Sequence, residues 1–174
     1  MPPDASRLRL RALRTSDEDA FAEAHRQLLA EDFEFGIHYQ PGMPWDDYLQ
    51  AVSDQSLGLS LPDGWVRNTR LVADVGGILV GRTSIRHELN DFLLQYGGHI
   101  GYAVVPDHRW RGHATEILRQ SIAVAHTIGV DRVLVTCDEA NIGSVKAIEA
   151  CGGRLENVVP LPPDNVPRRR YWID

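Results

Sequence analysis

The chain has 174 residues, of which 43% are hydrophobic and 24% are charged, and its formal net charge is −6. This length and composition suit one folded globular domain over residues 1–174, because no repeat, linker or charge block divides the sequence. The negative net charge argues against nucleic acids and anionic membranes as partners, since binding their phosphates requires clustered lysines and arginines.

Two further absences narrow the class of protein. The sequence has no run of about 18 apolar residues and no signal-peptide pattern, so we expect a soluble cytoplasmic protein. Its two cysteines, Cys137 and Cys151, belong to no Cys-x-x-Cys pattern and accompany no paired histidines. We therefore expect two reduced thiols and no metal site.

The first part of the chain predicts an outer strand followed by two helices. Residues 7–13 alternate arginine with apolar residues, which is typical of a strand with one wet face. Thr15-x-x-Glu18 has the form of a capping box, and the helix that it starts is expected to end near residue 31. Residues 33–43 are irregular and aromatic, and a second helix is expected over residues 45–56.

The middle of the chain predicts a hairpin and a central strand. Residues 69–75 and 78–89 are rich in apolar residues, and the Gly76-Gly77 pair supplies the positive φ angles of a two-residue connection. Residues 90–96 fit a turn or a short helical stretch. Residues 99–105 form an apolar run that Pro106 stops, which predicts a buried strand.

The last part of the chain predicts two helices and three strands. A helix begins near Gly112 and runs to about residue 127, and the apolar run in 131–136 predicts a strand covered on both faces. A further helix begins at Asn141 and ends at Gly152-Gly153. Strands over 154–159 and 168–173 complete the order β-α-α-β-β-β-α-β-α-β-β, which predicts a mixed α/β fold.

The loop between the central strand and the third helix predicts an anion site. It reads Arg109-Trp110-Arg111-Gly112-His113-Ala114. A strand that turns directly into a helix leaves several backbone N–H groups unpaired at the positive end of the helix dipole. The motifs of a P-loop and of a dinucleotide fold are both absent. The alternative is that the small residues only permit close packing of the turn.

The pattern Arg109-x-x-Gly112-x-Ala114 resembles the pyrophosphate loop Gln/Arg-x-x-Gly-x-Gly/Ala of the GNAT family of N-acetyltransferases, which binds acetyl-coenzyme A. The segment from Asn141 to Gly153 is similar to a second motif of that family. The resemblance covers roughly residues 7–174 and is strongest to a little-characterised bacterial branch. It implies the GNAT fold, with a central, mostly antiparallel sheet of six to seven strands and about four helices.

The resemblance also implies a set of residues that bind acetyl-CoA, largely through the main chain. The central strand is expected to bulge near its end and to splay from the next strand, so that its exposed backbone pairs with pantetheine. No metal is implied. The implied cofactor-binding residues are Val104, Val105, Arg109, Trp110, Arg111, Gly112, His113, Ala114, Thr115, Asn141 and Ser144.

Catalytic side chains are less clearly marked. Ile148 stands where many family members carry a tyrosine that protonates the leaving thiolate. Tyr102, or a water held by Asn141, could take its place. His99 is a candidate general base because an imidazole titrates near neutral pH, although a histidine within a strand is commonly structural. Asp138 is a further candidate for the base, and His87 and Glu88 lie on the preceding strand.

The resemblance implies that the protein transfers the acetyl group of acetyl-CoA to a primary amine by direct attack. The alternative is an acyl-CoA-binding sensor without turnover, which the isoleucine at position 148 favours; an O-acyltransferase or a transferase of longer acyl chains also remains open. The acceptor is expected to be a small-molecule or peptide amine, bound by a monomer or homodimer. Acidic residues near the presumed entrance would suit a cationic amine, or are simply solvated: Asp32, Glu34, Asp46 and Asp47.

Overall fold

One seven-stranded sheet runs through the computed structural model, which describes residues 5–174; the first four residues of the predicted single domain lie outside it. The strands are β1 (Arg9–Arg11), β2 (Asn68–Val75), β3 (Ile78–Arg86), β4 (Ile100–Val104), β5 (Val133–Asp138), β6 (Arg154–Leu161) and β7 (Val166–Ile173). Their order across the sheet is β1-β2-β3-β4-β5-β7-β6. Neighbouring strands are antiparallel except for β4 and β5, so the predicted fold class is confirmed.

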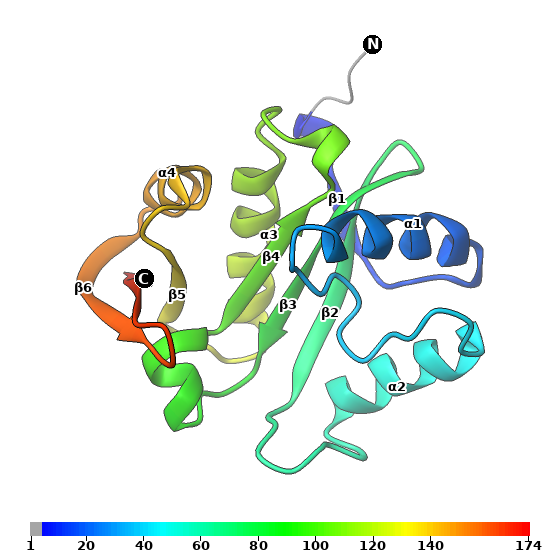
Figure 1. Cartoon of the computed structure of the whole chain (residues 1–174), viewed down its shortest axis with the longest axis horizontal. Coiled ribbons are helices and arrows are strands. Elements are labelled where there is room, and N and C mark those ends of the chain that lie inside the picture. Colours follow the sequence, from blue (N-terminus) through cyan, green and yellow to red (C-terminus); the bar gives the residue numbers. More distant parts are fainter. Residues whose placement is uncertain (1–4) are drawn as a thin grey trace.

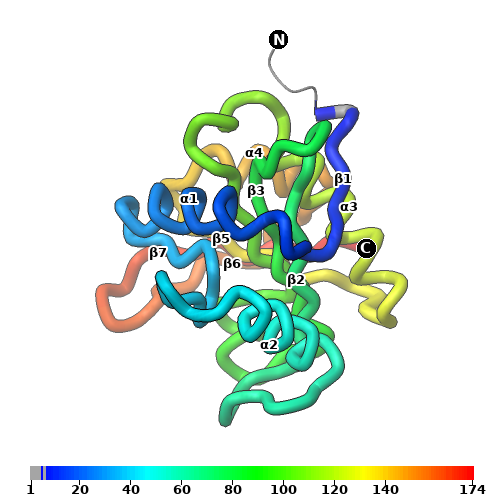
Figure 2. Tube along the Cα trace, turned by 90° about the vertical axis from the view of Figure 1, so that its right-hand side faces the viewer, coloured from blue at the N-terminus to red at the C-terminus, as the bar shows by residue number. Residues whose placement is uncertain are grey.

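Helices cover both faces of this sheet (Figures 1 and 2). One face carries α1 (Glu18–Leu29) and α2 (Trp45–Leu57), and the other carries α3 (His113–Thr127) and α4 (Ile142–Ala150). A π-helical turn, η3 (Leu93–Gly97), precedes β4. Three short 3-10 turns are η1 (Ala5–Arg7), η2 (Thr15–Asp17) and η4 (Pro106–His108). The predicted order of strands and helices is confirmed throughout.

One local prediction in the first part of the chain was wrong. The expected capping box from Thr15 to Glu18 does not form; instead the Asp17 carboxylate accepts a hydrogen bond from the Arg14 N–H at 2.7 Å. Asp17 also pairs with Arg11 at 2.7 Å, and Arg11 in turn pairs with Asp74 of β2 at 2.8 Å. An ion-pair network therefore links the start of the helix to the sheet. This network includes Asp74, which is distant from the helix in the sequence.

Separate cores lie under the two helix pairs. Beneath α3 and α4 the core is aliphatic and includes Ile100 and Ile148. Beneath α1 and α2 it is aromatic, with the ring of Phe21 lying 5.2–5.4 Å from four other aromatic rings. Tyr39 and Trp45 are buried members of this aromatic core. Ile78 is 49% exposed because it adjoins the hairpin turn.

The strands β4 and β5 meet at a single point and then diverge. Their only paired residues are Ile100 and Val135. Gly98 permits this contact, because it has φ of 66° and a Cβ atom there would lie 2.6 Å from the Leu134 carbonyl oxygen. The predicted splay is present. The predicted bulge is not seen on the β3 side, since the β3–β4 register runs without a shift from Ile100 to Val104.

Candidate active site

The loop before α3 presents unpaired backbone N–H groups. Trp110 and Gly112 both have left-handed conformations, with φ of 63° and 78°, and no side chain caps the helix. The N–H of Glu116 is bonded back to the Gly112 carbonyl at 3.2 Å. Among the described residues, the N–H groups of Gly112, Ala114 and Thr115 have no acceptor. With the helix dipole behind them, these groups suit a phosphate or diphosphate.

Side chains of the same loop point in different directions. Arg111 is exposed, and Trp110 is 92% exposed. Arg109 is partly engaged, because its guanidinium pairs with Glu31 at 2.6 Å and its Nε donates to the Val104 carbonyl at 3.3 Å. His113 is buried at the first position of the helix, so only its main chain faces the loop. The loop therefore offers main-chain donors together with one exposed guanidinium.

The edge of β4 that faces β5 has backbone groups to offer. In an antiparallel pair, successive residues direct their N–H and C=O groups alternately toward and away from the partner strand. The Val105 N–H donates to the Val80 carbonyl at 2.9 Å, so the N–H groups of Val104 and Tyr102 point away from β3. Because β4 and β5 diverge beyond Ile100, these groups line the opening between the two strands.

Tyr102 places a phenol on the side of this opening that faces α4. Its hydroxyl is buried and has no acceptor in bonding geometry among the described residues. Burial raises the pKa of Tyr102 to about 12, and Ser144, at the start of α4, lowers it in part. The phenol therefore keeps its proton at neutral pH and, among the described residues, has no acceptor, so it is available to donate to a bound group. The raised pKa also makes it a weaker acid than an ordinary tyrosine.

His99 has a structural contact on the neighbouring strand. The ring nitrogen Nδ1 accepts the Leu134 N–H at 2.9 Å, and the backbone N–H of His99 donates to the Leu134 carbonyl at 2.7 Å. The side chain is 7% exposed. Burial, and then the charge of Arg86, lower the pKa of His99 to about 4. Since that lone pair is occupied and the ring is a weak base, the geometry argues against His99 as the general base.

The other predicted polar residues also have local partners. The Asp138 carboxylate pairs with Arg168 of β7 at 2.5 Å. Asn141 is the N-cap of α4, and its side-chain oxygen accepts the Ser144 N–H at 3.0 Å. His87, on the segment after β3, lies 2.8 Å from the Thr69 hydroxyl. The structure thus brings Tyr102 and Ser144 together at the opening and ties Asp138 and His87 to other partners.

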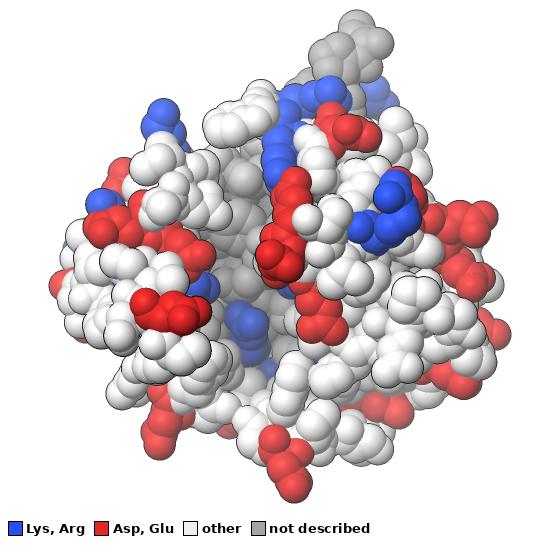
Figure 3. All heavy atoms as spheres, viewed as in Figure 1, with Lys and Arg blue, Asp and Glu red and all other residues white. Residues whose placement is uncertain are grey.

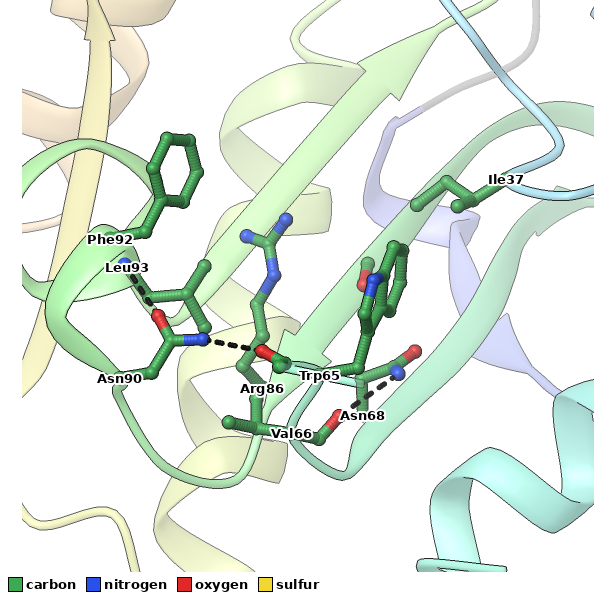
Figure 4. A pocket seen from close by; sticks show the side chains of 10 residues that line it. Ile37, Trp65, Val66, Asn68, Arg86, Asn90, Phe92 and Leu93 are labelled. Carbon is green, nitrogen blue, oxygen red and sulfur yellow. Dashed lines mark hydrogen bonds between the residues drawn. The ribbon is translucent and has the colours of Figure 1, made fainter. Parts of the chain in front are cut away.

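A pocket of about 230 Å³ lies on the other side of the sheet, between β2, β3 and η3. Figure 4 shows the Arg86 guanidinium projecting into it between Trp65 and Phe92. Figure 3 shows a hollow on this side of the molecule with Lys or Arg atoms on its floor. This site was not predicted from the sequence. The available signal was the alternation Arg82-Thr-Ser84-Ile-Arg86, which puts arginines on one face of a central strand.

No group of three or more His, Cys, Asp or Glu residues in the described range is arranged to hold a metal ion. None of the helices within residues 5–174 is long and apolar enough to cross a membrane. Cys137 and Cys151 are both free thiols, as expected.

Comparison with known families gives one match to most of the chain. A model described as an acetyltransferase (GNAT) domain matches residues 7–154. No curated protein matches by sequence.

Solved structures resemble the whole described fold. RimJ of Mycobacterium smegmatis, in complex with a CoA disulfide, is 18% identical with a TM-score of 0.71, over 99% of this chain and 84% of that one. RimL, a ribosomal L7/L12 alpha-N-protein acetyltransferase with coenzyme A bound, is 16% identical with a TM-score of 0.69, over 98% and 96%. A spermidine N-acetyltransferase of Vibrio cholerae, bound to CoA and spermine, is 18% identical with a TM-score of 0.66, over 97% and 95%. At these identities the likeness establishes the fold.

Proposed function

The chain belongs to the GNAT acetyltransferase family, and from that premise we propose that it transfers the acetyl group of acetyl-CoA to a primary amine. The observation that carries the proposal is the set of N–H groups of Gly112, Ala114 and Thr115, which have no acceptor within residues 5–174, beside the opening between β4 and β5. Such a set fits the diphosphate of CoA, and the opening fits an extended arm that bonds to a strand edge.

The donor would be held mainly by the backbone. The main chain from Arg109 to Thr115 would bind the diphosphate, with Arg111 adding charge and Trp110 offering an exposed aromatic face. The pantetheine arm would pair with the free edge of β4, and the Val104 N–H would face the thioester oxygen. Asn141 would act indirectly, by fixing the start of α4 and with it Ser144.

The chemistry needs few side chains. The lone pair of a neutral amine attacks the thioester carbonyl carbon, and the Val104 N–H stabilises the negative charge that develops on oxygen. When the C–S bond breaks, the electron pair leaves with sulfur, which takes a proton from Tyr102. The nitrogen loses its extra proton to water, and water restores the proton of Tyr102. With His99 and Asp138 occupied by other partners, solvent is the proton acceptor in this scheme.

The acceptor would be a small-molecule or peptide amine. The structural relatives named above act, by their names, on a ribosomal protein and on spermidine. Those two acceptors share only the amine, so for this chain the choice of acceptor must come from its own pocket.

A second candidate is an acyl-CoA-binding sensor without turnover. Ile148, at the position of the usual tyrosine, is 0% exposed and cannot donate a proton, which favours this reading. One experiment distinguishes the two functions. It measures CoA binding by calorimetry, and it measures the release of free thiol from acetyl-CoA across a panel of amines. Binding with turnover supports the transferase, whereas binding without turnover with every amine supports the sensor.

The diphosphate site is tested by charge reversal at the exposed arginine of the loop. The Arg111→Glu variant should bind CoA roughly 10- to 30-fold more weakly, since two unit charges change close to the diphosphate. Arg132→Glu is the control, because Arg132 is an exposed arginine that follows the other end of α3. Equal CoA affinity of the Arg111→Glu variant and the wild-type protein would place the diphosphate elsewhere.

A further inference from the structure

Arginines gather on the α1–α2 face of the central strands. Arg82 and Arg86 alternate with Ser84 along β3, and Arg70 of β2 is paired in register with Ser84. Arg82 is 8% exposed, and Arg70 and Arg86 are partly buried. A sheet face that packs against helices is normally apolar, so three charges here require a reason.

These arginines have carbonyl partners in place of carboxylates. Arg82 donates to the carbonyls of Phe35 and Glu34 at 3.0 and 3.1 Å. Arg86 makes two long bonds of 3.3 and 3.4 Å to the carbonyls of Gly97 and Gly98.

Arg70 donates to the Ile37 carbonyl at 3.0 Å, and its Nη2 is buried without an acceptor in the described part of the chain. Within residues 5–174, none of the three arginines forms an ion pair with a carboxylate. The charge of the cluster is therefore offset at close range by backbone carbonyls, by the Asn68 side-chain oxygen, which accepts from Arg70 at 3.0 Å, and by the Phe33 ring, which lies 5.1 Å from the Arg82 guanidinium.

Burial and mutual repulsion both act on this cluster. Burial, followed by the charges of neighbouring arginines, lowers the pKa of Arg82 and of Arg86 to about 10. Tyr48, and then the charge of Glu34, offset only part of the effect on the pKa of Arg82 and Arg70, and the Glu34 carboxylate is exposed and accepts the His38 N–H at 3.0 Å. An anion at this place would relieve the unbalanced charge.

The pocket gives that anion a specific position. Arg86 is the arginine that lines it, and Asn68 and Ser84 add polar groups. The walls are apolar, from Ile37, Trp65, Phe92 and Leu93. A Cβ atom on Gly101 would lie 3.3 Å from Nη1 of Arg86, which places this guanidinium beside β4. Gly101 and Val104 are three positions apart, which is about 10 Å along a strand.

We propose that the amine acceptor carries a carboxylate, which Arg86 binds, about 10 Å from the reacting nitrogen, with an apolar spacer lying between Trp65 and Phe92. This inference rests on the proposed acetyltransferase function. It replaces the cationic amine that the acidic residues of the sequence suggested, because the residues described as lining this pocket include Arg86 and no carboxylate, whereas Asp32 and Glu34 line a separate pocket.

Steady-state kinetics with matched acceptors test the charge preference. The wild-type protein should acetylate ω-aminooctanoate with a kcat/KM about tenfold or more above that of ω-aminooctanamide and of octanediamine. In Arg86→Gln the preference for the carboxylate should fall to about twofold or less, whereas Arg86→Lys, which keeps the charge, should retain most of it. Arg154→Gln is the control, since Arg154 is an exposed arginine of β6.

A binding measurement separates this inference from the proposed function. Octanoate should change the fluorescence of Trp65 in a saturable way and octanamide should not, with Trp65→Phe identifying the signal. Saturable binding of octanoate that Arg86→Gln removes supports the site even if no amine is turned over. Turnover that favours the amide or the diamine, or octanoate binding unaffected by Arg86→Gln, would overturn the anionic acceptor and leave the transferase intact.

Discussion

The side chain of His99 joins the two halves of the sheet. Its Nδ1 accepts the Leu134 N–H in a buried position. In His99→Ala that N–H loses its partner, so we expect the free energy of unfolding to fall by roughly 1–3 kcal/mol. Chemical denaturation measures the loss. His99→Asn, whose side-chain oxygen can accept the same N–H, should lose less, and equal losses in the two variants would contradict the assigned contact.

The same residue should make stability depend on pH. Burial, and then Arg86, lower the pKa of His99 from 6.5 to about 4. Between these values the unfolded chain binds a proton that the folded protein does not, so the stabilising effect is complete above pH 6.5 and is lost as pH falls toward 4. The slope should not exceed about 1.4 kcal/mol per pH unit. Denaturation from pH 7 to 4 should show this slope in the wild-type protein and a smaller one in His99→Asn.

Tyr102 should matter to turnover and not to CoA binding. If its hydroxyl protonates the departing sulfur, Tyr102→Phe should lower kcat about 10- to 100-fold while the Kd for CoA stays within about twofold. Tyr96→Phe is the matched control, since Tyr96 belongs to η3 and lies before β4. An unchanged kcat for Tyr102→Phe would mean that the thiolate leaves without this acid.

At the scale of elements, one glycine sets where β4 approaches β5. A Cβ atom at Gly98 would lie 2.6 Å from the Leu134 carbonyl oxygen, and the backbone there has φ of 66°. Gly98→Ala should therefore combine backbone strain with a steric clash and destabilise the fold by about 2–4 kcal/mol. Gly129→Ala separates the two effects, because Gly129 has φ of 91° and nothing within 4 Å of its Cβ position. Its cost should be only about 1 kcal/mol.

The helix starts show how local sequence and distant contacts share control of an element. Gly112 begins α3 from a left-handed conformation with no side-chain cap among the described residues, and the sequence predicted that start. At η2 the turn begins one residue earlier than the predicted capping box requires, so that Asp17 accepts the Arg14 N–H. The ion pairs that join Asp17 to Arg11, and Arg11 to Asp74 of β2, have no local signature.

For the whole molecule, the opening between β4 and β5 predicts that the donor links two parts of the fold. A ligand that bonds to β4 and also contacts α3 and α4 binds only the folded protein. CoA at about 100 times its Kd should then add about 2.7 kcal/mol to stability. For a chain of this size the Tm should rise by about 5–10 °C. Thermal melts with and without CoA measure the shift, and an unchanged Tm at millimolar CoA would contradict binding at this place.

Much of the architecture could be predicted from the chain alone. Apolar runs, glycine pairs and the loop Arg109–Ala114 predicted the order of elements and the main-chain donors at α3, because those features depend on neighbouring residues. The pocket around Arg86 was not predicted. Its arginines lie on β2 and β3, and only pairing of Arg70 with Ser84 brings them onto one face.

The sequence by itself determined the family and a loop whose free donors belong to the backbone, since a strand that turns into a helix leaves its N–H groups unpaired wherever it occurs. Only the tertiary structure decided what the side chains do. It pairs His99 with Leu134 and Asp138 with Arg168, and it leaves the hydroxyl of Tyr102 without an acceptor in the described part of the chain. The physical reason is that the role of a polar group depends on its burial and on the partner it meets, and those partners come from segments far apart in the chain.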